Sequence, residues 1–347
     1  MKTNSTVKTL AGAATILALC VVILGAYVRL SDAGLGCPDW PGCYGKLVVP
    51  SAERAIDVAA QYERPFDSPK AWKEMAHRYL AGVLGLLILA LAVVAWRRRG
   101  DPNQSVLAPT ALLLLVIAQA ALGMWTVTLL LQPAIVLAHL IGGFATVCLC
   151  AWIALRSGPL NQAAPATHGP VGAVRPWLVL GIGVLIGQIL LGGWTSTNYA
   201  ALACPDFPTC HGSWWPAGAD FAQGFEIWRE AGLDHEGGRL PGEARVAIHV
   251  AHRVGAVVAF LYICALGIAL WRRAADRRLK IAAAAALTLL GLQVALGVSN
   301  VVLGLPLAVA VAHNGVAALL LLSLVLCVHH LWPRGEAEII GTSSTHE

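Results

Sequence analysis

The stretch AHRYLAGVLGLLILALAVVAW, residues 76–96, decides the fold. It carries no charge after its third residue, and it is long enough to cross a bilayer, which takes about 20 mostly apolar residues in a helix. Seven more runs of this kind occur along the chain, so we predict an all-α integral membrane protein with eight transmembrane helices. The predicted spans are residues 8–29, 76–96, 106–130, 134–155, 176–197, 247–271, 281–303 and 306–332.

The composition supports the same fold class. Of the 347 residues, 57% are hydrophobic and only 12% are charged, and the mean hydropathy is +0.68. Soluble domains contain about 25% charged residues. The net charge of +5 would suggest an acidic partner for a soluble protein. In a membrane protein the position of that charge matters more, so we expect a lipid bilayer around this chain and no nucleic-acid partner.

Positive charges in the short loops predict the orientation. Arg97, Arg98 and Arg99 follow the second span, and five basic residues lie between positions 272 and 280. Such clusters mark the cytoplasmic side, so both termini are expected there, and the long loops 30–75 and 198–246 are expected outside. We therefore predict a multi-pass protein of the bacterial inner membrane.

Two halves of the chain repeat each other. The first predicted outer loop reads CPDWPGCYG at residues 37–45, and the second reads CPDFPTCHG at residues 204–212. Four other pieces match in the same order, and the spacing of 20 residues from Gln to His is identical in both halves. They pair Ala76-His77-Arg78 with Ala251-His252-Arg253, Gln119 with Gln293, Leu137-Ala-His139 with Val311-Ala-His313, and the first span with the fifth. The first span is therefore expected to be a true span and not a cleaved signal peptide.

The repeat predicts the domain organisation. Each half has four spans, so both halves point the same way across the membrane, and a pseudo-two-fold axis along the membrane normal should relate two four-helix bundles. The predicted segments are an N-terminal half at 1–157, a cytoplasmic linker at 158–175, a C-terminal half at 176–334 and a polar tail at 335–347.

Four histidines lie inside the predicted spans, within about two turns of their outer ends. They are His77 and His139 in the first half, and His252 and His313 in the second half. Each half has one on its second helix and one on its fourth. Two imidazoles that face each other inside a four-helix bundle can hold a haem iron from both sides. Two other uses are a hydrogen bond between helices and a zinc site, although zinc would need a further ligand at this depth.

Small residues near these histidines would let a flat macrocycle approach the backbone, as glycines also do at plain helix contacts. They include Gly82, Gly142, Gly143, Gly255 and Gly315. The remaining histidines have weaker signals. We expect His168, His329, His330 and His346 to be solvated on the cytoplasmic side, and His211 and His235 lie in the outer loop without an assigned role.

One carboxylate breaks the symmetry of the halves. Glu74 precedes His77 by three residues, and the second half has His249 at the matching place. An acid one turn from an iron ligand could relay protons or stabilise developing positive charge, but it could also be an ordinary glutamate at a helix start. His249 could be an alternative ligand, a propionate partner or a polar residue of the outer surface. Arg78 and Arg253 could pair with haem propionates, or reach toward the membrane surface.

The outer loops each carry two cysteines, Cys37 and Cys43 in the first half and Cys204 and Cys210 in the second. The outer side of a bacterial inner membrane is an oxidising compartment, so we predict a disulfide in each loop. A metal site is the alternative, but too few other ligands lie nearby. Whether a disulfide only braces its loop or also exchanges electrons stays open at this point.

These residues together resemble haem A synthase, the membrane enzyme family that oxidises haem O to haem A for cytochrome oxidase. The resemblance covers about residues 8–332. It rests on eight spans together with Glu74-Met-Ala-His77-Arg78, Leu137-Ala-His139, Ala251-His252-Arg253, Val311-Ala-His313 and the outer cysteine pairs, in this order.

The resemblance implies a role for each half. The second half would hold a permanent b-type haem iron through His252 and His313, and the first half would bind the substrate haem O through His77 and His139. Glu74 would be the catalytic acid. The implied reaction converts a haem methyl group to a formyl group by successive hydroxylations and loss of water. It needs molecular oxygen or water as oxygen source and an electron donor or acceptor, and haem O synthase is an expected partner.

Two points stay open in this prediction. A bis-histidine iron has no free position for oxygen, so either a first-half ligand leaves during turnover or oxidation proceeds without oxygen on that iron. The main alternative function is a diheme b-type electron-transfer cytochrome with two permanent haems. That alternative predicts equivalent carboxylates in both halves, or none, and Glu74 argues against it. A haem transporter and a thiol oxidoreductase that uses the loop cysteines are further alternatives.

Overall fold

The computed structural model describes residues 5–51, 65–101, 104–157, 172–230 and 234–332. Eight long apolar helices occur in these residues, as predicted, and each is long enough to cross a membrane. They are α1 (Ser5–Leu30), α3 (Ser68–Arg97), α4 (Leu107–Thr128), α5 (Pro133–Arg156), α6 (Arg175–Thr197), α8 (Gly242–Arg273), α9 (Arg277–Val302) and α10 (Leu307–Leu331). The short helix α7 (Phe221–Gly224) lies in the outer loop before α8, and a 3₁₀ turn at Gly172–Val174 precedes α6. The polar tail, most of the linker, His168 and His346 lie outside the described residues.

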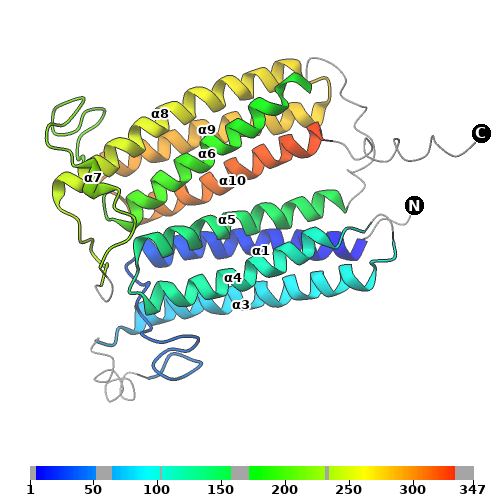
Figure 1. The fold of residues 1–347 in the computed structure, drawn as a ribbon, viewed down its shortest axis with the longest axis horizontal. Helices are drawn as coiled ribbons and strands as arrows, with labels where there is room; N and C mark the ends of the chain where they lie inside the picture. The colour runs from blue at the N-terminus through cyan, green and yellow to red at the C-terminus, as the bar shows by residue number, and fades with distance from the viewer. Residues whose placement is uncertain (1–4, 52–64, 102–103, 158–171, 231–233, 333–347) are drawn as a thin grey trace, which may run out of the picture.

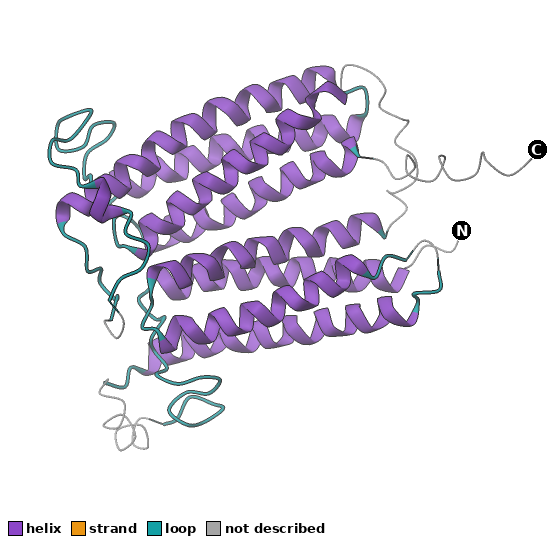
Figure 2. Cartoon of the chain, viewed as in Figure 1, coloured by secondary structure: helices purple, strands orange, loops and turns teal. Residues whose placement is uncertain are grey.

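The long helices form two bundles of four. In the first, α1 packs on α3 and α5, and α4 packs on α3 and α5; in the second, α6, α8, α9 and α10 repeat this pattern. Figure 1 shows the two bundles stacked on each other with all eight helices roughly parallel, and Figure 2 shows that the described elements are helices joined by loops. Each bundle has its own buried apolar cluster, one around Leu84, Leu91 and Leu112 and one around Leu178, Ile263 and Leu320.

The contacts between the bundles are consistent with the predicted two-fold axis, which stays a prediction. Helix α1 contacts α10, and α5 contacts α6. In the repeat α1 corresponds to α6 and α5 corresponds to α10, so a two-fold axis would turn one of these contacts into the other. The two ends of the bundles are named outer and inner after the predicted orientation. At the outer end, Arg29 of α1 donates to the Tyr199 hydroxyl and to the Ser196 carbonyl oxygen, at 2.9 and 3.0 Å. At the inner end, Arg156 donates to the carbonyl oxygen of Trp332 at 2.7 Å. Polar contacts therefore join the halves at both ends.

Helix α3 begins earlier than the apolar pattern indicated. Its first residue is Ser68, and the side chain of Asp67 accepts a hydrogen bond from the Lys70 N–H at 3.0 Å, as an N-cap does. Pro69 follows at the first helical turn, where proline is favoured. Helix α8 likewise begins at Gly242, before the predicted 247. Glu74 consequently lies inside a helix, as His249 already did in the predicted span, and each lies one turn before the next histidine.

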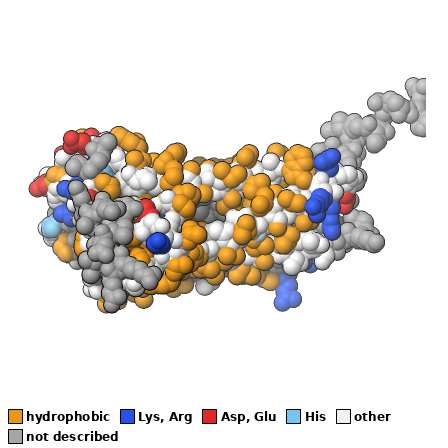
Figure 3. Space-filling view, turned by 90° about the horizontal axis from the view of Figure 1, so that it is seen from below, with side chains coloured by type: hydrophobic (Ala, Val, Ile, Leu, Met, Phe, Trp, Pro, Cys, Tyr) orange, Lys and Arg blue, Asp and Glu red, His pale blue; other side chains and the backbone are white. Residues whose placement is uncertain are grey.

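The sides of the bundles are apolar where lipid would lie, and Figure 3 shows this band of hydrophobic side chains. In the same view, Lys and Arg gather at the end where α1 begins and α10 ends, while the opposite end shows acids and bases together. One prediction about the inner end is wrong. His329 is buried and packs edge-on against Trp152 at 6.1 Å between ring centroids, so it is not solvated. His330 is partly buried beside Asp276, at 4.0 Å.

Candidate functional site

Each of the four histidines in the spans lies against a glycine of a neighbouring helix. A Cβ built on Gly25 of α1 would lie 2.9 Å from Cε1 of His77, and a Cβ on Gly192 of α6 would lie 3.1 Å from Cε1 of His252. The fourth helix of each half repeats the arrangement. There Gly123 of α4 faces His139 at 3.4 Å, and Gly297 of α9 faces His313 at 3.1 Å. A side chain at Gly25, Gly192 or Gly297 would push the imidazole aside, whereas a Cβ at Gly123 would make only an ordinary contact with His139. Three of the four rings therefore need a glycine beside them.

The two histidines of each half lie close enough for their charges to interact, His77 with His139 and His252 with His313. The Nδ1 atoms of His77, His139 and His313 are buried and have no hydrogen-bond partner. The Gln188 side chain contacts Nδ1 of His252 at 3.0 Å, and that of Gln293 contacts Nε2 of His313 at 3.3 Å. Buried polar atoms without partners are uncommon and often mark a binding site.

This arrangement fits a haem. Paired imidazoles from facing helices, ring nitrogens without partners and small residues beside them are what axial ligation of a flat macrocycle requires. The described residues contain no group of three or more His, Cys, Asp or Glu side chains that could hold a metal ion by themselves. A zinc site at either pair is therefore disfavoured, because zinc takes at least three protein ligands.

The glycines that contact the rings are not the ones picked out from the sequence. Gly142 lies against the Gln119 side chain, Gly255 against Gln188, and Gly315 against Ile23, while Gly82 has nothing near its Cβ position. The contacting glycines lie on neighbouring helices, so distance along the sequence could not reveal them. Their recurrence at matching places of the repeat, as in QAALG and QVALG, is the signal that could have done so.

Glu74 closes a hydrogen-bonded clamp over the first outer loop. Its carboxylate is buried and accepts from the Cys37 N–H at 2.8 Å and from Nη2 of Arg78 at 2.5 Å. The other terminal nitrogen of Arg78 donates to loop carbonyl oxygens, that of Asp39 at 2.8 Å and that of Gly42. Glu74 and Arg78 therefore fasten the disulfide loop onto the outer end of α3. A plain glutamate at a helix start would be solvated, and this one is not.

His249 occupies the same place in the second half. It is buried, its Nδ1 lies 3.2 Å from the Cys204 N–H that donates to it, and Nε of Arg253 lies 3.2 Å from its Nε2. Arg253 also donates to the carbonyl oxygens of Thr209, Cys204 and Asp206, at 2.7, 2.9 and 2.9 Å. The interpretation of His249 as a polar residue of the outer surface is wrong. The two halves use the same clamp with different acceptors.

The two arginines predicted as propionate partners are thus engaged with the outer loops. Arg78 and Arg253 each bind several backbone carbonyl oxygens, and Arg78 also pairs with Glu74. These contacts also argue against the alternative that the two arginines only reach toward the membrane surface. Their pairing with propionates stays a prediction, and it would have to compete with these bonds.

The outer loops are built twice from the same parts. The sulfurs lie 2.05 Å apart in Cys37–Cys43 and 2.01 Å apart in Cys204–Cys210, so both predicted disulfides are present. In the second loop, the Asp206 carboxylate accepts from the His211 N–H at 2.6 Å and from the Gly212 N–H at 2.9 Å. Hydrogen bonds from Thr209 and from these backbone groups hold the pKa of Asp206 well below its usual range. Asp39 binds the matching N–H groups of the first loop.

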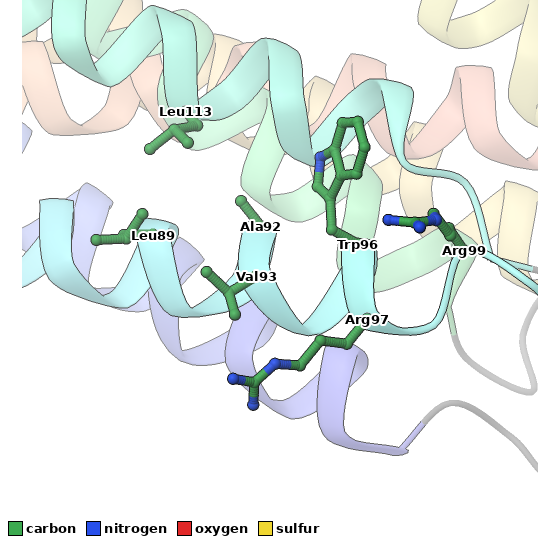
Figure 4. A pocket seen from close by; sticks show the side chains of 7 residues that line it. All are labelled: Leu89, Ala92, Val93, Trp96, Arg97, Arg99 and Leu113. Atoms are coloured by element: carbon green, nitrogen blue, oxygen red, sulfur yellow. The ribbon is translucent and has the colours of Figure 1, made fainter.

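Two surface hollows lie away from the four histidines of the spans. One, of about 260 Å³, lies at the inner end of α3 beside α4, and Figure 4 shows its lining side chains, among them Leu89, Trp96 and Leu113. Its apolar lining faces the region where lipid would lie. Another, of about 760 Å³, lies in the second outer loop and includes Tyr199 and Trp215. Neither contains a member of the histidine pairs or of the clamps.

The fold and the site define a class of protein. It is a multi-pass membrane protein of two repeated four-helix bundles, each with an interior histidine pair beneath a clamped disulfide loop. The chain belongs to the COX15-CtaA family of cytochrome oxidase assembly proteins, whose model matches residues 8–325.

Similar curated proteins point the same way. The chain is 43% identical over 324 residues to a protein of Shewanella oneidensis named "Heme A synthase", with 93% of this chain and 96% of that protein covered. It is 27% identical over 323 residues to a protein of that name from Halalkalibacterium halodurans, covering 91% and 94% of the two chains. A third, from Rhizorhabdus wittichii, is 29% identical over 340 residues, with 91% of each covered. The family and the bacterial relatives agree with a multi-pass bacterial membrane protein.

Proposed function

We propose that this chain has haem A synthase activity, the oxidation of a methyl group of haem O to a formyl group that yields haem A for cytochrome oxidase. The family and the names of its relatives support the reaction. The observation in the structure that carries it is the asymmetry of two otherwise matching halves. Both have a histidine pair inside the bundle, but only the first has a buried carboxylate one turn away, at Glu74, where the second has the buried His249.

This asymmetry supports an assignment of the two halves. The second half holds a permanent b-type haem through His252 and His313, and the first half binds the substrate haem O through His77 and His139. When bound, the b-type haem supplies one-electron oxidation and reduction, for a donor or acceptor that remains to be identified. The glycines beside the four rings leave room at the backbone. The apolar bundle excludes water from the reacting edge.

Glu74 supplies the negative carboxylate that takes part in the reaction. The Cys37 N–H and Arg78 hold its carboxylate at a fixed position near the outer end of α3. A fixed carboxylate acts on an oxidised methyl group in two ways, by accepting the proton that leaves or by stabilising positive charge that develops. Loss of Glu74 should therefore slow the oxidation more than it weakens haem binding. The oxygen atom comes from molecular oxygen or water, and a haem O synthase delivers the substrate.

The orientation also belongs to this proposal. Arg and Lys gather at the inner end in Figure 3, and this supports cytoplasmic termini by the positive-inside rule. The clamped disulfide loops then face the oxidising side of the membrane. Fusions of a periplasm-dependent reporter after residue 157 and after residue 215 test it, with activity expected only from the second.

The test compares matched variants in cells that supply haem O. Glu74→Gln keeps the size of the side chain and removes its charge, and His249→Gln changes the equivalent residue of the second half. Haem is extracted from the purified proteins and separated by chromatography. We expect wild type and His249→Gln to make haem A, and Glu74→Gln to retain haem B and stop at haem O or a hydroxylated intermediate.

The alternative is a diheme b-type electron-transfer cytochrome. It predicts about two equivalents of haem B in wild type, no haem A at any time, and no difference between the two variants. That result would overturn both the reaction and the assignment of the first half as the substrate site.

A further inference from the structure

The outer loop between Phe225 and Leu240 contains a half-buried arginine, Arg229, whose guanidinium is only partly hydrogen-bonded. Two guanidinium nitrogens of Arg229, Nε and Nη2, are buried and have no hydrogen-bond partner. Among the described residues, Arg229 also forms no ion pair. Burial lowers the pKa of Arg229, and the charge of Glu226 opposes this shift. Because buried charges in proteins are normally paired, these nitrogens indicate an absent anionic partner.

This loop belongs to the second half by sequence, but it lies on the first half. The Gln132 side chain, at the turn between α4 and α5, donates to the carbonyl oxygen of Arg229 at 3.2 Å. The backbone N–H of His235 donates to the carbonyl oxygen of Leu130 in the same turn, at 3.0 Å. Lys70 at the start of α3 pairs with Glu236 at 3.5 Å. Three contacts thus place the loop over the outer end of the first bundle.

A second polar group without a partner lies beside Arg229. His235 is only 2% exposed, and its Nδ1 has no hydrogen-bond partner. Its ring lies close enough to Arg229, and also to Arg239 and Asp234, for their charges to act on it. Arg229 and His235 therefore bring nitrogens without hydrogen-bond partners close to each other.

This point lies above the histidine pair of the first half. Gln132 precedes His139 by seven residues, which corresponds to about 10 Å along α5. A haem whose iron lies between His77 and His139 carries two propionate carboxylates. Charged groups are costly in the apolar interior, so the propionates must point toward the outer end. Their reach from the iron is comparable to this distance, and Arg78 is already bound to Glu74 and the loop.

We propose that Arg229 and His235 bind the propionate carboxylates of the substrate haem, so that the outer loop of the second half completes the substrate site of the first. This inference rests on the proposed function. A guanidinium matches a carboxylate with two parallel hydrogen bonds, and an imidazole N–H adds a further donor. The site therefore selects porphyrins with free carboxylates. It also gives the long outer loop, for which the sequence offered no role, a part in substrate binding.

The test measures selectivity for the carboxylates. Purified protein that carries its resident haem is titrated with iron protoporphyrin IX and, separately, with its dimethyl ester, and the Kd is taken from the absorbance change. His77→Ala is the blank for binding outside the first half. We expect wild type to prefer the free acid on the order of tenfold or more. Arg229→Gln should bring the ratio of the two Kd values close to one.

The matched control is Arg239→Gln. Arg239 lies on the same loop but is exposed, and its Nε donates to the carbonyl oxygen of Asp234. This variant should keep the wild-type preference. Arg229→Lys keeps the charge but loses the planar fork, so it should give an intermediate ratio. It also serves as the test if Arg229→Gln fails to fold, which thermal unfolding and the spectrum of the resident haem reveal.

The outcomes separate two kinds of failure. If the Arg229 variants keep the wild-type ratio while His77→Ala abolishes binding, the first half is a haem site and the role of Arg229 is overturned. If His77→Ala binds both porphyrins as wild type does, the first half is not the substrate site. In that case the proposed function fails, and the proposal for Arg229 fails with it.

Discussion

The two halves fasten their outer loops in the same way but with side chains of different chemistry. In the first half the Glu74 carboxylate accepts from both Cys37 and Arg78. In the second half the same two kinds of donor converge on the ring of His249. A carboxylate can accept from both, whereas a neutral imidazole has only one acceptor nitrogen. One of the two contacts of His249 is therefore not a full hydrogen bond.

This difference bears on the role of Glu74. A histidine at the matching position is enough to hold the second loop over α8, so the fold needs an acceptor there but not a negative charge. The clamp therefore does not require the negative charge of Glu74. This residue lies one turn from His77. This is the reason, beyond proximity alone, to connect it with the chemistry of the first half.

The largest expected effect is on haem content. His252→Ala should remove the resident haem, because the iron loses an axial ligand inside the membrane. His77→Ala should keep the resident haem and lose only the substrate. Both variants should make no haem A. The haem-to-protein ratio, measured as the pyridine complex, checks this, with His211→Ala, an exposed loop histidine, as control. Retention of haem in His252→Ala and its loss in His77→Ala would reverse the assignment of the halves.

Removal of the two clamps should have unequal effects on stability. Glu74→Ala leaves the partly buried Arg78 without its anion and the Cys37 N–H without its acceptor, at a cost of about 3 kcal/mol or more. His249→Ala removes a neutral acceptor that satisfies one donor, at a cost of about 1–3 kcal/mol. Thermal unfolding in detergent compares the two, and the first variant should melt at the lower temperature. Equal melting temperatures would mean that the carboxylate adds nothing to the clamp beyond what the imidazole provides.

A carboxylate in the second clamp should improve it. His249→Glu should raise the free energy of unfolding by about 1 kcal/mol, since a carboxylate accepts from both the Cys204 N–H and Arg253. Production of haem A should not increase, because the acid would then be next to the permanent haem. The same melting experiment and haem extraction serve as readout. A lower melting temperature would show that His249 is already well matched to its donors.

The smallest effect concerns the tight turns that end α4 and α9. The first turn has Leu130 at a φ of +51°, and the matching residue of the second turn is Gly304 at +69°. Gly304→Ala should cost about 1 kcal/mol, because a side chain disfavours this conformation. Leu130→Gly should be nearly neutral, since relief of strain is offset by the greater freedom of the unfolded chain. A large loss of stability in Leu130→Gly, measured by thermal unfolding, would indicate that the Leu130 side chain, and not its backbone alone, holds the outer loop.

Parts of the site were predictable because their signals are local or repeated. Eight apolar runs give eight helices, since a backbone in lipid must satisfy its hydrogen bonds within each segment. The cysteine pairs are close in sequence, so their disulfides needed no knowledge of the fold. The internal repeat placed His77 with His139 and His252 with His313, and it marked Glu74 as the residue without a counterpart.

The sequence by itself thus determined the membrane, the repeat, the family, the four histidines and the two cysteine loops, because length, polarity and spacing carry that information. Only the tertiary structure decided that Arg78 and Arg253 bind loop carbonyls, that His249 and His329 are buried, and that Arg229 lies over the first half. These facts depend on which surfaces meet after the helices pack. A charged or polar side chain finds its partner across the fold, and no pattern along the chain reports that partner.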